Sequence, residues 1–486
     1  MRWLGPDGPR AQDVPGQDGP RAQDVPGPDG PWRRTSGRRV RMPRVVVVSP
    51  PFLSHAQPLA VLAGALRERG ADVHFACAPA FEHLARRAGT GFVPLSVTRN
   101  ANTGVAEATR QDAREAERLR EFLDATREGA VAALLAQARH RRADMLADPE
   151  AVLEALRTTD RRLRPDWYVV DQLSYPVTLA LHCLGVPYAT FCPGHPSYVL
   201  SGPDAWFGLP YAWPDAVRPD PEALEELSGA VRANDEAFTR LFAAFARENA
   251  PSRPAPGRAF ALSSPHAVVH AYPRLPWLPT GPEGPVRLFA GHMAAPAAAL
   301  DAQWVARLKG LRGAAARVVL VALGTFLSAR DDVLRTVVTG VLEGLRDTAV
   351  VVAAGERTGT LADLAGDRVV VVPSVPQQAL LEHVDAMVHH GGGNSFTECL
   401  RAGVPALVLP FSSDQFSIAY DAQRSGAGLV LDPNTLTIDD VPTALRALWG
   451  DTGPRPTELT RAVRRRGPGW AAEELLAVMD RGVAGA

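Results

Sequence analysis

Short runs of β-branched residues that alternate with helical stretches are the feature that most restricts the fold of this chain. In the first half the runs cover residues 44–49, 72–77, 91–95, 167–171 and 187–192. In the second half they cover residues 317–323, 349–354, 368–372, 386–390, 405–410 and 428–432. Nearly continuous Val and Leu runs are typical of parallel strands buried on both faces, with the intervening helices covering the sheet. We therefore predict an α/β fold of two doubly wound, Rossmann-like domains that face a central cleft.

Proline and glycine divide the chain into these two halves. The stretch PRLPWLPTGPEGP at residues 273–285 is rich in both, so we predict an N-terminal domain over 44–275, a linker over 276–315 and a C-terminal domain over 316–462. The last residues, 463–486, are interrupted by Gly-Pro-Gly at 467–469. We expect them to form a helix that packs back toward the N-terminal domain.

The first 43 residues do not look like part of either domain. GPDGPRAQDVP at 5–15 is followed by the near copy GQDGPRAQDVP at 16–26 and by a decayed third copy. A repeated polar unit of this length cannot bury a core, so we predict a disordered tail rich in proline and glycine over 1–43. Because Met42 stands just before the first strand, translation starting there is an alternative to a genuine tail.

Charge and cysteine content exclude several classes of function. The chain has 486 residues, with Lys+Arg 52 against Asp+Glu 53. A protein that follows nucleic-acid phosphates usually has a basic excess, so we expect no nucleic-acid partner. No apolar run reaches the ~18 residues of a membrane span, and no apolar signal segment follows Met1. The four cysteines form no C-x-x-C pair, so we expect a cytoplasmic protein. We expect it to be either a monomer or a homodimer.

The glycine-rich turn after the strand at 386–390 is the strongest local signal for a ligand site. His390 is followed by Gly391, Gly392 and Gly393, and then by Asn394 and Ser395. The glycines allow close backbone approach, and we expect Asn394 and Ser395 to cap a helix over 396–402. A helix N-terminus of this kind attracts anions, because its free N–H groups and its positive dipole end face the ligand.

The longer segment around this turn resembles the donor-binding signature of the UDP-glycosyltransferase superfamily of the GT-B fold. The matching residues, in order, are Pro376-Gln377, Leu381, His383, His390, Gly392, Asn394-Ser395, Glu398, Gly403-Val404-Pro405, Pro410 and Asp414-Gln415. The resemblance implies that the C-terminal domain binds a nucleotide-diphosphate sugar and that the N-terminal domain binds the acceptor.

The resemblance also implies a role for each matching residue. His390, Gly392, Asn394 and Ser395 would bind the diphosphate, with Thr325 in the Gly-Thr pair after the first strand of that domain as a second phosphate contact. Glu398 would bind the ribose, Gln377 would lie near the base and ribose, and Asp414 with Gln415 would bind hydroxyls of the transferred sugar. The pair Asp414-Gln415 favours a hexose such as glucose, and UDP is the expected nucleotide. Ser374 replaces an aromatic residue that often stacks on the base, so dTDP stays open.

The catalytic candidates are His55 and Asp171. His55 lies after the first strand, in Ser54-His55-Ala56-Gln57-Pro58, at the edge where an open α/β sheet places its site. Family members have G-H-x-x-P here, which implies that His55 is the general base, and its ordinary pKa of ~6.5 suits that task. Asp171 ends a strand in D-x-x-S-Y-P, a stretch similar to one in the bacterial macrolide branch. This similarity implies that Asp171 orients His55, although an Asp at the end of a strand also commonly caps the next helix.

These residues together predict an inverting glycosyltransferase without an obligatory metal or other cofactor. The acceptor is expected against the loop 193–213 and the insert 104–163, with Trp206, Phe207 and His195 as its contacts, and is expected to be a small natural product. Three alternatives stay open: a dTDP-deoxysugar transferase, a non-catalytic GT-B relative that activates a partner enzyme, and a nucleotide-sugar epimerase.

Overall fold

The computed structural model describes residues 32–35, 38–97, 113–144, 146, 148–281, 283–324, 327–450 and 457–484. The chain divides into two compact units, Met1–Arg41 and Met42–Ala486. In the first unit the structure describes an antiparallel hairpin of β1 (Trp32–Thr35) and β2 (Arg38–Arg41). The end of the predicted disordered tail therefore contains regular structure. The first two repeats, over 5–26, lie outside the described residues.

The N-terminal part of the second unit is built on a seven-stranded sheet in the order β5-β4-β3-β6-β7-β8-β9. All of its neighbouring strands are parallel. The strands are β3 (Arg44–Val48), β4 (Asp72–Cys77), β5 (Gly91–Pro94), β6 (Trp167–Asp171), β7 (Tyr188–Cys192), β8 (Ala267–His270) and β9 (Val286–Phe289). The order reverses between β3 and β6, so the carboxyl ends of these two central strands form the edge where doubly wound sheets bind ligands.

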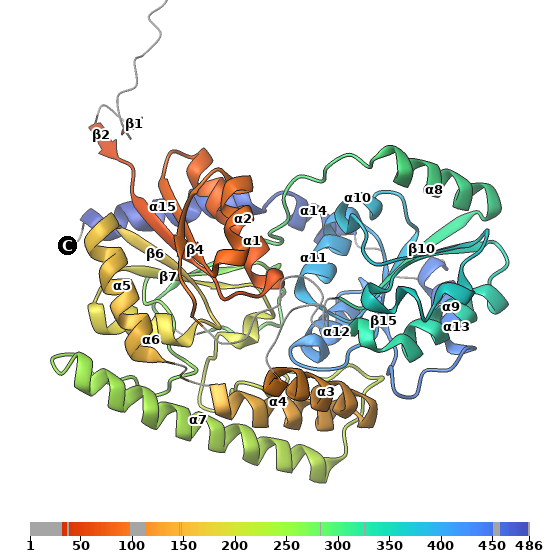
Figure 1. The fold of residues 1–486 in the computed structure, drawn as a ribbon, viewed down its shortest axis with the longest axis horizontal. Coiled ribbons are helices and arrows are strands. Elements are labelled where there is room, and N and C mark those ends of the chain that lie inside the picture. The colour runs from red at the N-terminus through yellow and green to blue at the C-terminus, as the bar shows by residue number, and fades with distance from the viewer. Residues whose placement is uncertain are drawn as a thin grey trace, which may run out of the picture. The chain divides into compact units, whose positions relative to one another are not determined.

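The C-terminal part is built on a six-stranded sheet in the order β12-β11-β10-β13-β14-β15. Its neighbouring strands are again parallel. The strands are β10 (Arg317–Ala322), β11 (Thr348–Ala353), β12 (Val369–Val372), β13 (Ala386–His389), β14 (Ala406–Val408) and β15 (Gly428–Val430). Two parallel α/β sheets were predicted from the alternating runs, and the structure confirms them (Figure 1).

Helices cover both sheets. Those of the first half are α1 (Leu53–Glu68), α2 (Glu82–Ala88), α3 (Ala113–Glu128), α4 (Ala130–Asp144), α5 (Pro149–Leu163), α6 (Tyr175–Leu184) and α7 (Pro221–Asn249). Those of the second half are α8 (Ala302–Ala314), α9 (Asp331–Gly344), α10 (Gln377–Leu380), α11 (Gly393–Ala402), α12 (Gln415–Arg424), α13 (Asp440–Trp449), α14 (Thr457–Arg464) and α15 (Pro468–Ala484). Short 3₁₀ turns are η1 (Pro79–Phe81), η2 (Pro196–Tyr198), η3 (Leu327–Ala329), η4 (Gly355–Thr358) and η5 (Ala362–Leu364). No helix among the described residues is long and apolar enough to cross a membrane.

The predicted linker over 276–315 is too long at both ends. Strand β9 lies inside it and pairs with β8, so the N-terminal sheet continues to Phe289. Helix α8 also lies inside it and packs Trp304 and Leu308 against the C-terminal sheet. The Pro- and Gly-rich stretch therefore connects β8 to β9 within one sheet, and the crossing between the domains follows β9.

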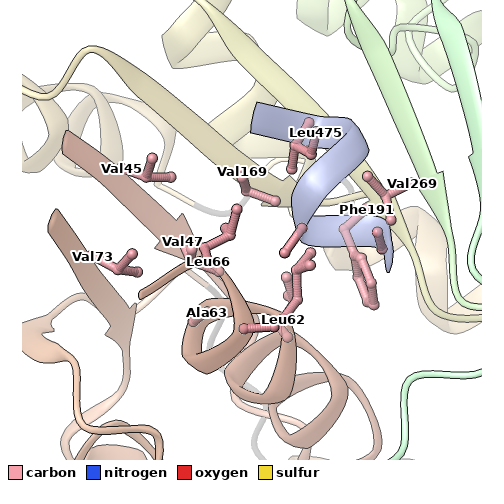
Figure 2. Packing of buried hydrophobic residues seen from close by; sticks show 14 of the residues in the cluster. Val45, Val47, Leu62, Ala63, Leu66, Val73, Val169, Phe191, Val269 and Leu475 are labelled. Carbon is pink, nitrogen blue, oxygen red and sulfur yellow. The ribbon is translucent and has the colours of Figure 1, made fainter. Parts of the chain in front are cut away.

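The C-terminal helix belongs to the N-terminal core. Leu475 of α15 packs in one cluster with Leu62 and Leu66 of α1 and with Val169 and Val269 of the sheet (Figure 2). These side chains are nearly fully buried, and each such burial stabilises the fold by roughly 2 kcal/mol. The chain thus crosses between the domains twice, once after β9 and once before α15, as we expected for its last helix.

The hairpin of α3 and α4 connects the two halves at another place. Phe122 and Leu123 of α3 are buried in the core of the C-terminal sheet. The guanidinium of Arg330, at the start of α9, donates to the carbonyl of Thr126 at 2.9 Å, and Arg127 donates to the carbonyl of Ala329 at 3.3 Å. An insert of the N-terminal half is therefore fixed to the C-terminal domain.

Candidate functional site

The two predicted catalytic residues lie side by side. Asp171 is the last residue of β6, and His55 is in the first turn of α1, which follows β3. Their side chains meet at 2.9 Å between Nδ1 of His55 and Oδ2 of Asp171. The other carboxylate oxygen of Asp171 accepts the N–H of Leu173 at 2.9 Å, which fixes the carboxylate in place. With Nδ1 donating to Asp171, Nε2 of neutral His55 keeps its lone pair for a proton.

The groups around His55 favour the protonated form of its imidazole. Burial by itself lowers the pKa of His55, but the charge of Asp171, the hydrogen bond to it and the charge of Asp414 outweigh burial. The pKa of His55 is consequently raised above its ordinary value of 6.5. A raised pKa makes this imidazole a stronger base once it is neutral.

The first turn of α1 also carries a contact between the domains. The helix begins at Leu53, and Pro58 therefore lies inside it. Proline has no N–H, so the carbonyl four residues before it, that of Ser54, loses its helical partner. The side-chain amide of Asn394 in the C-terminal domain donates to this carbonyl at 3.1 Å.

Helix α11 also starts earlier than predicted. Its N-cap is Gly392, without a side-chain cap, and the helix begins at Gly393. Asn394 and Ser395 are thus first-turn residues and not the N-cap, which corrects our sequence interpretation. The reason is that Gly392 supplies the extended N-cap backbone by itself, with φ −68° and ψ 142°. The N–H groups of an uncapped first turn are the donors that an anion requires.

His390 lies between two glycine turns. A Cβ at Gly324 would meet the imidazole at 2.5 Å, and a Cβ at Gly392 would meet it at the same distance. Gly324 also has φ +76°, so glycine is required there for two reasons. Burial lowers the pKa of His390 to about 4, and Nδ1 has no hydrogen-bond partner. The neighbouring His389 is fully buried and accepts the N–H of Gly391, so the pair does not act together.

Glu398, Gln377 and Ser395 form one cluster behind the first turn of α11. Gln377 donates to Glu398 at 2.7 Å and contacts the hydroxyl of Ser395 at 3.3 Å. Gln378 donates to the other oxygen of Glu398 at 2.9 Å, and burial raises the pKa of this carboxyl. The structure therefore brings together residues that we predicted to contact the nucleobase, the ribose and the diphosphate of the donor. Thr325 lies outside the described residues.

Asp414 and Gln415 are already engaged by protein groups. Asp414 accepts the N–H of His195 at 2.8 Å, and burial raises the pKa of its carboxyl. The amide oxygen of Gln415 accepts the N–H groups of Phe411 and Ser412 at 2.9 and 3.2 Å, so it holds its own loop. The contact with His195 uses one carboxylate oxygen of Asp414, whereas the amide oxygen of Gln415 accepts two N–H groups.

His195 lies between the domains, and its side chain is fully buried. Nδ1 accepts the N–H of Ser197 at 3.1 Å, and Nε2 contacts Asp421 of α12 at 3.0 Å. Because both ring nitrogens are occupied, the structure does not present His195 to an acceptor as predicted. Asp421 was missed by sequence reasoning. Besides His195, it accepts the hydroxyl of Tyr272 at 2.9 Å and the indole N–H of Trp277 at 2.6 Å.

The two aromatic acceptor candidates occupy different surroundings. Phe207 is buried and stacks on Phe260 with ring centroids 5.0 Å apart. Trp206 is half-buried beneath the guanidinium of Arg258, at 4.5 Å from the ring centroid. Arg141 of α4 lies 4.3 Å above the ring of Phe207, and sequence reasoning missed it. Over the described ranges, no three His, Cys, Asp or Glu side chains gather in a way that could hold a metal ion.

Known proteins resemble this chain in sequence and in fold. Residues 340–464 match the family model "Erythromycin biosynthesis protein CIII-like, C-terminal domain". A curated relative, the uncharacterized UDP-glucosyltransferase YdhE of Bacillus subtilis, is 32% identical over 116 residues, which cover 24% of this chain and 29% of that protein. The match therefore spans less than a third of the relative's length.

Solved structures cover far more of the chain. The glycosyltransferase of kitacinnamycin has a TM-score of 0.64 at 23% identity, covering 90% of this chain and 100% of that one. The glycosyltransferase VinC in complex with dTDP has a TM-score of 0.59 at 24% identity, with coverage of 90% and 100%. The solved structures confirm the predicted GT-B fold. The family-model match, over residues 340–464, agrees with the resemblance that the sequence showed in that segment.

Proposed function

We propose that this GT-B protein, with its erythromycin-CIII-like C-terminal domain, is an inverting glycosyltransferase that moves a hexose from a nucleotide-diphosphate sugar to a hydroxyl of a small natural product. The observation that carries the proposal is the 2.9 Å contact between His55 and Asp171, joined to the uncapped start of α11 through the hydrogen bond of Asn394 to Ser54. A general base and an anion site thus face each other across the two domains.

The proposed reaction is a single displacement. Nε2 of His55 takes the proton of the acceptor hydroxyl, whose oxygen attacks the anomeric carbon as the bond to the diphosphate breaks. Asp171 stabilises the imidazolium that forms, because its carboxylate already accepts the proton on Nδ1. The N–H groups at the start of α11 and the imidazole of His390 receive the charge of the leaving diphosphate. Every step uses groups of this chain, so we propose that no metal or other cofactor is obligatory.

UDP-glucose is the first donor to test, because Asp414 keeps one oxygen for a hydroxyl of the transferred sugar. A dTDP-deoxysugar is the second, and a specific observation favours it. The amide oxygen of Gln415 is occupied by backbone N–H groups, so one predicted hydroxyl contact is lost. A deoxysugar has fewer hydroxyls, so it loses less binding energy when the amide oxygen of Gln415 cannot accept one. The neighbour VinC was solved with dTDP, in accordance with this second candidate.

The test is a matched assay of donors and acceptors. Purified protein is incubated with UDP- and dTDP-sugars and with phenolic or macrolide acceptors, while free nucleotide diphosphate and product mass are measured. We expect a mass gain of one sugar that depends on the acceptor, with a rate about 10²- to 10⁴-fold lower in His55→Ala. Donor binding without transfer in every pairing would instead support a partner-activating relative. Nucleotide release from donor alone, without acceptor dependence, would support an epimerase or hydrolase.

A further inference from the structure

Arg141 is half-buried and has no hydrogen-bond or carboxylate partner within the ranges that the structure describes. Two other enclosed arginines of the chain show the usual arrangement. Arg258 contacts both oxygens of Asp235 at 3.2 Å and donates to two carbonyls. Arg330 pairs with Asp332 at 2.8 Å and donates to the carbonyl of Thr126. Enclosed charges are normally paired in this way, so an unpaired one requires an explanation.

The local structure makes room for this guanidinium instead of excluding it. It lies 4.3 Å above the ring of Phe207, where the face of the aromatic ring attracts a cation. At Gly208, which has φ +100°, a Cβ would come within 2.6 Å of a nitrogen of Arg141. Burial lowers the pKa of Arg141, while the nearby hydroxyls of Tyr198 and Tyr175 act in the opposite direction. The nitrogens of Arg141 are not among the fully enclosed polar atoms, so they remain accessible.

Further polar groups around Arg141 are also incompletely paired. The hydroxyl of Tyr175 accepts the amide of Gln172 at 3.1 Å, which leaves its own proton to donate. Burial raises the pKa of Tyr175 well above its usual value, so that this proton is retained. Gln172 is nine-tenths buried, and its amide oxygen has no partner. Gln172 directly follows Asp171, the residue that contacts the proposed base His55.

We propose that Arg141 and Tyr175 form a subsite for a carboxylate of the acceptor, which sets the acceptor class as a hydroxylated, carboxylate-bearing natural product. That the bound molecule is the acceptor rests on the proposed function. The carboxylate site itself rests on the unpaired guanidinium of Arg141. Arginine offers two parallel N–H groups to the two oxygens of a carboxylate, and the hydroxyl of Tyr175 supplies a third donor. The carboxylate restores the pairing that the chain gives Arg258 and Arg330 internally.

Equilibrium binding without donor tests this subsite directly. The probes are 6-hydroxy-2-naphthoic acid and its methyl ester, which share the ring and the hydroxyl and differ in charge. We expect the native protein to bind the acid at least tenfold more tightly than the ester. In Arg141→Gln the acid should lose that advantage while the affinity for the ester changes less than twofold. Arg141→Lys should retain part of the preference, because it keeps the charge without the planar fork.

Arg232→Gln is the matched control, because Arg232 is exposed and lies 5.8 Å above the ring of Trp206. It should leave the preference for the acid unchanged. Equal affinity for acid and ester in the native protein, or an intact preference in Arg141→Gln, would overturn the proposal. A purely structural role would weaken both probes equally. Acid-selective binding combined with no sugar transfer to any acceptor would reject the transferase and retain the carboxylate site.

Discussion

At the scale of single residues, the pair His55 and Asp171 was predictable because each residue lies in a short motif at the carboxyl end of a strand. The parallel register of β3 and β6 then places the two ends together. His195 shows the opposite case. Its sequence neighbours, PGHPS, look like an open loop, whereas its partner Asp421 lies 226 positions further along the chain. No local pattern could show that these two side chains meet.

The pH dependence of the reaction follows from the same pair. A general base acts when neutral, so kcat/KM should rise with pH and level off above the pKa of His55, which is raised above 6.5. Asp171→Asn removes the charge that opposes burial, so the pKa of His55 falls and the midpoint of the rise moves to lower pH. The rate on the plateau should fall by about 10²-fold or more, because the imidazolium loses its stabilising charge.

The measurement is kcat/KM between pH 5 and 9 for both proteins, with Asp166→Asn as the control. Asp166 precedes β6 at the opposite end of the strand and accepts the N–H of Arg44 at 2.7 Å. Its variant should keep the native midpoint. A midpoint that moves upward in Asp171→Asn would contradict the assignment of His55 as the base.

At the scale of elements, the strands were predicted closely, because a buried parallel strand is marked by its own composition. The run at 167–171 coincides with β6, and the run at 72–77 with β4. Strands β8 and β9 were missed because AVVH and VRLF are short, and Pro and Gly fill the segment between them. The start of α11 was missed for a related reason. The glycines before Asn394 resemble a helix boundary, although Gly393 already belongs to α11.

Pro58 offers a test of how α1 and α11 are connected. Pro58→Ala introduces an N–H that can bond the carbonyl of Ser54 within the helix, in competition with the amide of Asn394. We expect the free energy of unfolding to stay equal or to rise by about 1 kcal/mol, because a proline inside a helix is unfavourable. The KM for the donor should rise by up to about fivefold, since a hydrogen bond of this kind contributes roughly 1 kcal/mol.

A double-mutant cycle with Asn394→Ala separates this effect from direct donor contacts. If both changes act through the carbonyl of Ser54, the effect of Pro58→Ala on KM disappears once Asn394 has been removed. Fully additive effects would mean that the contact seen at 3.1 Å does not position the donor site.

At the scale of the whole Met42–Ala486 unit, one buried carboxylate gathers three contacts between the two domains. Asp421 of α12 accepts from His195, Tyr272 and Trp277, all of which precede the C-terminal sheet in the chain. Since Nδ1 of His195 accepts the N–H of Ser197, Nε2 carries the proton and donates it to Asp421. The backbone N–H of the same His195 holds Asp414. One residue therefore links the domain contact to the proposed sugar site.

This arrangement predicts a combined loss of stability and donor affinity in Asp421→Asn. The amide keeps one acceptor oxygen but turns an NH₂ group toward a donor, so at least one buried hydrogen bond is lost. We expect the free energy of unfolding to fall by about 2–3 kcal/mol. The KM for the donor should rise more than the KM for the acceptor, because Asp414 loses its fixed position. Urea unfolding and initial rates measure the two effects, with the exposed Asp439→Asn as the control. A variant that loses stability while both KM values stay native would show that the carboxylate holds the domains together without positioning the donor.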